Sequence, residues 1–171
     1  MKAIVVYESM FGSTEEIAQA IGEGLAPRAV VEVVNVDDAP TDLAGADLLV
    51  VGGPTHVHGM SRASTRQSAQ QQAAESVRSH TGIRDWLGSL PHAPAGVRAV
   101  AFDTRLDKPR WLVGSAARGA QKLLRRHGYP VLAKPGSFFV TGSGQQGLAP
   151  GEKDRAREWA RSLTAKTVTH T

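Results

Sequence analysis

Short apolar runs alternate with segments of helical periodicity along most of this 171-residue chain. Apolar runs bounded by turn residues are typical of buried strands, and their alternation with helices is typical of a parallel sheet covered on both faces. The sequence therefore predicts a doubly wound α/β domain with five parallel strands. We place these strands at Ala3 to Tyr7, Val30 to Val36, Asp47 to Gly52, Val97 to Phe102, and about Val131 to Val140, where Pro135 interrupts or bulges the last one.

Four helices are predicted between and after these strands. In the first, Ile17, Ala20, Ile21 and Leu25 share one face, and the helix ends before Pro27. The others are placed at Ile83 to Leu90, Val113 to His127, and Pro150 to Leu163 with the proline in its first turn. The connection from Ser61 to Pro91 is polar over Ser61 to His80. Its part from Arg66 to Ala74 is rich in Gln, Ser and Ala, so we expect that part to pack poorly.

Length and composition predict a single domain over residues 1–163, followed by a disordered tail over residues 164–171. The absence of cysteine excludes disulfides and thiolate metal sites, and it is compatible with the cytoplasmic location that we expect. No apolar run approaches the length of a membrane span. The formal net charge of +4 favours acidic partners without indicating nucleic acid.

The first strand runs directly into a hydroxyl-rich turn and then a helix. The turn contains Ser9, Met10, Phe11, Gly12, Ser13 and Thr14. A helix start presents unpaired backbone N–H groups and the positive end of the helix dipole, so it solvates an anion. Three hydroxyl groups add donors, and the glycine allows close approach of the backbone. The turn therefore predicts a phosphate-binding loop.

The same turn argues against three other ligands of this architecture. A dinucleotide fold needs G-x-G-x-x-G, of which the turn has only Gly12, and a nucleoside triphosphate loop needs Gly-Lys-Ser/Thr. A phosphoryl-accepting regulator needs an aspartate after the third strand, where the chain has Gly52, Gly53 and Pro54. Because ligands of open parallel sheets bind beyond the carboxyl ends of the strands, we expect the loops at 8–13, 53–62 and 103–111 to form the site.

The chain resembles the flavodoxin family, most closely over its first twenty-one residues. The family signature is matched by Val5, Val6, Tyr7, Ser9, Gly12, Thr14, Ala18 and Ile21. The resemblance implies the flavodoxin-like strand order 2-1-3-4-5 and FMN as cofactor, with its phosphate held by residues 9–14. It further implies that the ring is clasped by Pro54, Thr55, His56, Val57, His58 and Gly59 on one side and by Asp103, Thr104 and Arg105 on the other.

The ring-binding loops differ from the usual flavodoxin pattern. They offer no obvious aromatic partner except Trp111, for which ring contact and core packing are equally compatible with the sequence; Trp86 and Trp159 are predicted core residues. Several cations lie on or near these loops: Arg62, Arg66, Arg105, Lys108 and Arg110. Our hypothesis is that they stabilise the reduced flavin anion and raise the two-electron potential.

The resemblance implies electron transfer to a redox partner protein, or an FMN-dependent reductase using a small-molecule acceptor such as a quinone. Two alternatives remain at this stage. One is a quinone- or porphyrinogen-directed oxidoreductase, with the polar connection as a lid over its substrate. The other is a flavin-free binding or regulatory module of the same fold, because fold does not determine function. His56 and His58 could suggest a metal site, but the sequence supplies no third ligand, so we predict none.

Overall fold

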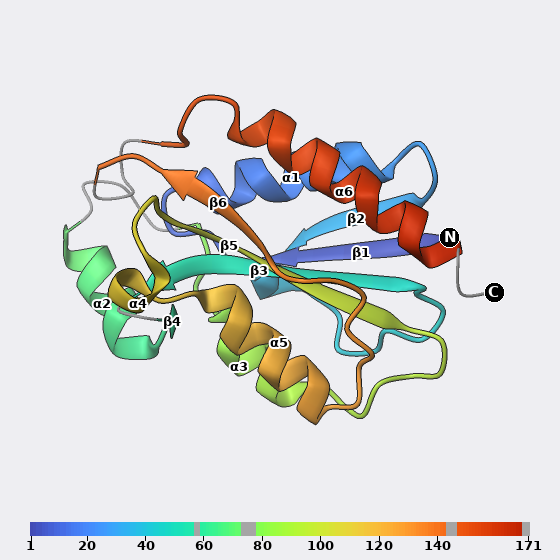
Figure 1. Ribbon diagram of the computed structural model, residues 1–171. Helices are drawn as coiled ribbons and strands as arrows, with labels where there is room; N and C mark the ends of the chain where they lie inside the picture. The colour runs from blue at the N-terminus through green and yellow to red at the C-terminus, as the bar shows by residue number, and fades with distance from the viewer. Residues whose placement is uncertain (57–58, 73–77, 143–146, 169–171) are drawn as a thin grey trace.

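The computed structural model describes residues 1–56, 59–72, 78–142 and 147–168. It shows one sheet with helices on both faces (Figure 1). The strands are β1 (Lys2–Tyr7), β2 (Val30–Asn35), β3 (Leu48–His56), β4 (Gly59–Met60), β5 (Arg98–Leu106) and β6 (Gly136–Val140). The helices are α1 (Ser13–Leu25), the 3-10 turn η1 (Val36–Asp38), α2 (Ala63–Gln72), α3 (Ile83–Ser89), α4 (Arg110–Val113), α5 (Ala116–Arg126) and α6 (Glu152–Val168).

The sheet order is β2-β1-β3-β5-β6, and all neighbours in this path are parallel. The predicted doubly wound fold with strand order 2-1-3-4-5 is confirmed, since β5 and β6 are its fourth and fifth strands. The short strand β4 lies off this path and pairs antiparallel with the end of β3.

Two apolar layers hold the helices to the sheet. Helices α1 and α6 cover one face, and α3 and α5 cover the other (Figure 1). The residues of β3 alternate between the layers, with Leu48 and Val50 facing α1 and α6, and Leu49 and Val51 facing the opposite side. This two-sided burial explains why the central strands are continuous apolar runs.

Two glycines make close packing possible. A Cβ at Gly52 would lie 2.0 Å from the Phe102 ring, so this position of β3 accommodates the aromatic side chain of β5. A Cβ at Gly24 would lie 2.5 Å from the carbonyl oxygen of Arg157, so the glycine brings α1 against α6. Both contacts depend on the missing side chain rather than on an unusual backbone conformation.

Several boundaries differ from prediction. Strands β3 and β5 run on to His56 and Leu106, and β6 begins only after Pro135. The polar connection contains α2, which the lack of large apolar residues did not predict. Helix α6 begins after Pro150 and continues to Val168, so the expectation of a disordered tail from residue 164 was wrong for residues 164–168. Within the described ranges, no helix combines the length and apolar character needed to cross a membrane.

Candidate functional site

The carboxyl ends of β1, β3 and β5 lie at the same end of the sheet, next to α2, α4 and β4 (Figure 1). Ligands of open parallel sheets bind beyond this end of the strands. The three loops singled out from the sequence therefore lie at the same end of the molecule, and each of them supplies a different kind of group.

The turn after β1 has the geometry of an anion cradle. Gly12 has a φ of 102° and immediately precedes α1, a conformation that favours glycine. The buried Ser9 side chain accepts hydrogen bonds from the N–H groups of Gly12 at 3.1 Å and Glu15 at 3.3 Å, which fixes the turn. Among the described residues, no partner accepts from the N–H groups of Met10, Phe11, Ser13 and Thr14. These donors fit a phosphate group.

The hydroxyl groups of this turn are in different situations. Thr14 Oγ1 is 2.7 Å from Thr104 Oγ1, so the turn is bonded to the end of β5. The Ser13 hydroxyl has no hydrogen-bond partner in the described part of the chain. Met10 is buried, whereas Phe11 is 36% exposed. Ser13 is therefore the hydroxyl most directly available to a ligand.

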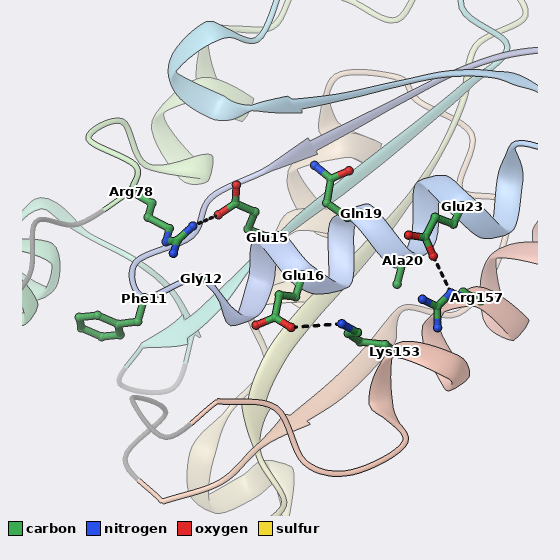
Figure 2. A pocket seen from close by; sticks show the side chains of 10 residues that line it. All are labelled: Phe11, Gly12, Glu15, Glu16, Gln19, Ala20, Glu23, Arg78, Lys153 and Arg157. Carbon is green, nitrogen blue, oxygen red and sulfur yellow. Dashed lines mark hydrogen bonds and ion pairs between the residues drawn. The ribbon is translucent and has the colours of Figure 1, made fainter.

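Arg78 adds a cation that sequence reasoning missed. Its backbone N–H donates to the Met10 carbonyl at 3.3 Å, and its Nε would lie 3.2 Å from a Cβ at Gly12. Its guanidinium also pairs with Glu15 at 2.6 Å, as Figure 2 shows. No sequence pattern connects Arg78 with a loop more than sixty residues earlier. The cation offsets the acidic first turn of α1 and is favourable for an anion at the turn.

A groove of about 290 Å³ follows the exposed face of α1 away from Gly12 (Figure 2). Its cations and carboxylates pair with one another, because Lys153 is 3.5 Å from Glu16 and Arg157 is 2.6 Å from Glu23. These pairs tie α6 to α1. These two ion pairs therefore stabilise the contact between α1 and α6, and their charges are not free to bind a ligand.

The second loop is partly built from strand. Pro54, Thr55 and His56 belong to the end of β3, and Gly59 belongs to β4. Thr55 Oγ1 accepts from the N–H of Ala116 at 3.1 Å, so this side chain is engaged with the start of α5. The predicted contacts Val57 and His58 lie outside the described residues.

His56 is a partly buried residue with a buried ring nitrogen at this end of the sheet. Its Nε2 atom has no hydrogen-bond partner among the described residues, and burial lowers the pKa of the imidazole, with a smaller contribution from the positive charge of Arg66. A neutral ring with an unpaired nitrogen is suited to a hydrogen bond with a ligand. Across the described ranges, no three His, Asp or Glu side chains are grouped as metal ligands.

The third predicted segment is the end of β5 rather than a loop. Asp103 Oδ2 accepts from Ser115 Oγ at 2.6 Å and from the N–H of Ala117 at 3.0 Å, so this carboxylate caps α5. Thr104 is bonded to the turn after β1, and its contact with the ring stays a prediction. The Arg105 guanidinium donates to the Lys108 carbonyl at 2.7 Å and lies against the Phe139 ring.

Glu8 is a second residue that sequence reasoning missed. It is fully buried at the end of β1, where Oε2 accepts from the N–H of Ile83 at 2.8 Å and Oε1 accepts from Ser61 Oγ. Arg66 donates to the same hydroxyl at 3.2 Å and pairs with Asp85 at 3.0 Å. Burial raises the pKa of Glu8, against the opposing effect of these hydrogen bonds. The network holds the connection between β4 and α3 against the site.

The structure limits the hypothesis that five cations act on the flavin. Arg66 is occupied by Asp85 and Ser61, and Arg105 is directed at backbone carbonyls and Phe139, so neither is available as proposed. Trp111 is 82% exposed, which excludes the core-packing alternative for this residue. Trp86 is buried, as predicted, and Trp159 is partly buried against Phe138.

The fold defines a doubly wound α/β protein, and the turn after β1 is a candidate anion site at its first helix. A sequence model of the flavodoxin family matches residues 5–87, just short of half the chain, and this protein is flavodoxin-like. FMN is the cofactor of flavodoxins. No curated protein sequence matches the chain significantly.

Similar solved structures support the same fold. A flavodoxin from the domain Archaea is 20% identical, with a TM-score of 0.67, over 98% of this chain and 99% of that one. Flavodoxin 1 from Bacillus cereus is 19% identical, with a TM-score of 0.67, over 100% and 99%. Flavodoxin 2 from the same organism is 17% identical, with a TM-score of 0.70, over 97% and 99%. At these identities the structures show a shared fold.

Proposed function

We propose that this chain binds FMN and transfers electrons, either to a redox partner protein or as an FMN-dependent reductase. The observation that carries the proposal is the turn after β1, with its unpaired N–H groups, its available Ser13 hydroxyl and the nearby Arg78. Fixed donors at a helix start, supported by a cation, fit a phosphate monoester.

The residues of the other two segments would contact the ring. His56 offers an unpaired nitrogen, and the backbone of Thr55 and Gly59 lies at the same end of the sheet. Trp111 is an exposed aromatic side chain on α4 that could cover the ring face. Bound FMN supplies the redox chemistry, and the protein groups bind, orient and shield it.

Asp103 and Thr55 act indirectly in this proposal. Both accept hydrogen bonds from the first turn of α5, so they fix the ends of β3 and β5 that border the ring position. They are positioning residues for the cofactor site. A cytoplasmic location and a quinone as acceptor remain predictions.

The alternatives differ in what the Ser61 to His80 connection does. In a quinone- or porphyrinogen-directed enzyme it would cover a substrate, and Arg66 and Glu8 would hold it in place. In a flavin-free module it would contribute only structure. Reduction of quinones by the FMN-loaded protein separates enzyme from carrier, and a protein that neither carries nor takes up FMN supports the module.

The test is the visible spectrum of the purified protein before and after FMN addition, followed by calorimetric titration of Ser13→Ala. The substitution removes a hydroxyl without breaking a hydrogen bond of the described structure. A hydrogen bond to a charged group contributes about 1.5–3 kcal/mol, so FMN affinity should fall by roughly 10- to 150-fold. Ser89→Ala, in α3, is the control and should leave affinity unchanged. An unchanged affinity in Ser13→Ala contradicts phosphate binding at this turn.

A further inference from the structure

The outer edge of β6 has a pocket that shares only Arg105 with the predicted FMN contacts. It has a volume of about 550 Å³, and residues from β5, β6, α4 and α6 line it. Figure 1 shows β6 at the sheet edge with α6 alongside. Among the described residues, five cations and no carboxylate line this pocket. The cations are Arg105, Arg110, Lys134, Arg155 and Lys166.

Two buried side chains of the pocket wall have unused hydrogen-bonding capacity. Arg105 is 9% exposed and Ser137 is 8% exposed. Within the described part of the chain, Arg105 Nε and Ser137 Oγ have no hydrogen-bond partner. Buried polar groups of native proteins are normally bonded, but both atoms are shielded from solvent and lie beneath the pocket wall, so a ligand would first meet the cations of the lining.

Aromatic packing fixes two of the cations. The guanidinium carbons of Arg105 and Arg155 lie 5.1 Å and 5.2 Å from the centroid of the Phe139 ring. Arg155 also donates to the Ser137 carbonyl at 2.6 Å and pairs with Glu152. Guanidinium groups held in place lose little freedom when an anion binds.

The edge of β6 is closed to an added strand. The Ser137 carbonyl is bonded to Arg155, the Phe139 N–H donates to Glu152 at 2.6 Å, and the Phe139 carbonyl accepts from Ala149 at 2.9 Å. A peptide could not pair with this backbone. The pocket must therefore recognise its ligand through the charged and aromatic side chains.

The cations are spread along the strand. Arg105 is opposite Phe139, whereas Lys134 precedes the start of β6 by two residues. At about 3.3 Å per residue, roughly 16 Å of chain separates these positions. A single phosphate cannot reach both, but an elongated polyanion can. Trp159 adds an aromatic side chain to the lining, next to Gly136.

We propose that this pocket binds a nucleotide that carries at least two phosphate groups. Arginine and lysine side chains are the usual ligands of phosphates in proteins, and a nucleobase matches the aromatic side chains of the lining. The site is separate from the phosphate turn at residues 9–14, which contributes nothing to its lining, and of the predicted ring contacts only Arg105 lines it.

The experiment titrates ATP and, separately, inorganic triphosphate into the full chain at low salt, both without FMN and with FMN in excess. The variant Lys134→Glu/Lys166→Glu reverses two charges of the pocket. Its control is Lys122→Glu/Arg126→Glu, which makes the same charge change on the exposed surface of α5. We expect ATP affinity to fall at least about tenfold in the pocket variant and to stay near the wild-type value in the control. Circular dichroism checks that both variants fold.

Four results would overturn the proposal. They are no heat with ATP, triphosphate binding without ATP binding, the same loss of affinity in both double variants, and ATP binding that disappears when FMN is added. The last result would assign the ATP signal to the phosphate turn. Binding of both probes with loss only in the pocket variant supports the site, and tighter binding of ATP than of triphosphate adds a role for the nucleobase.

Discussion

At the scale of single residues, burial changes the ionisation of Glu8. Its carboxylate is buried and bonded to Ile83 and Ser61, and burial raises its pKa above the ordinary value of 4.5. The folded protein therefore holds this proton more tightly than the unfolded chain does. The resulting stabilisation is fully present below pH 4.5 and is lost as the pH rises through the raised pKa of the folded state.

Glu8→Gln removes this titration and keeps one oxygen acceptor and the side-chain shape. We expect the unfolding free energy of the variant, relative to wild type, to increase as the pH is raised from about 4 to 7. Urea unfolding at several pH values measures the difference. A difference that is constant over this range would show that Glu8 has the same pKa in both states.

At the level of elements, the start of α5 depends on Asp103. Removing this carboxylate in Asp103→Ala leaves the Ser115 hydroxyl and the Ala117 N–H unsatisfied in a buried place. We expect the unfolding free energy to fall by about 2–4 kcal/mol. Asp103→Asn should recover most of it, because the amide oxygen can accept both hydrogen bonds.

The two Asp103 variants also test its role at the cofactor site. Asp103→Asn should bind FMN with nearly wild-type affinity, because the carboxylate itself points to α5 rather than to the cofactor. A large loss of FMN affinity without loss of stability would instead assign Asp103 to direct contact with FMN. Denaturant unfolding and FMN titration of the same samples distinguish these results.

The packing of α1 against α6 gives a second prediction for elements. Gly24→Ala places a methyl group 2.5 Å from the Arg157 carbonyl and 2.8 Å from Ala160 Cβ, so the helices must separate. We expect a loss of about 1–3 kcal/mol. In α3, a Cβ at Gly88 would have no atom within 4 Å, and Gly88→Ala should raise the unfolding free energy by about 0.5–1 kcal/mol. Thermal unfolding of both variants measures the contrast, and equal effects would contradict the helix contact.

The elements differ in how far the sequence predicts them. The parallel strands and α1 follow from apolar periodicity and from the turn before α1. The end of β3 and strand β4 do not, because Pro54 to His56 are only partly buried and their pairing is stabilised by tertiary contacts. Two further contacts join distant parts of the chain. The N–H of Ile83 donates to Glu8, and the guanidinium of Arg78 lies beside Gly12. No local sequence pattern encodes such contacts.

Across the whole molecule, the segment before α3 is bound to the end of β1 and to the following turn. Ser61 and Ile83 bond to Glu8, and the Ser79 hydroxyl accepts from the Ser9 N–H at 2.9 Å. A ligand at the turn would therefore contact a region stabilised from two sides. Binding there should stabilise the folded state as a whole, because ligand that binds only the native protein raises its unfolding free energy.

At an FMN concentration of 100 times its measured dissociation constant, the stabilisation should be about 2.7 kcal/mol. For a chain of this length, that corresponds to a rise in Tm of roughly 5–11 °C. Riboflavin at the same concentration lacks the phosphate and should give a much smaller rise, because the N–H groups of the turn, the Ser13 hydroxyl and Arg78 then have no anion to bind. Differential scanning calorimetry compares the two ligands. Equal shifts would mean that the ring alone carries the affinity and that the turn after β1 binds no phosphate.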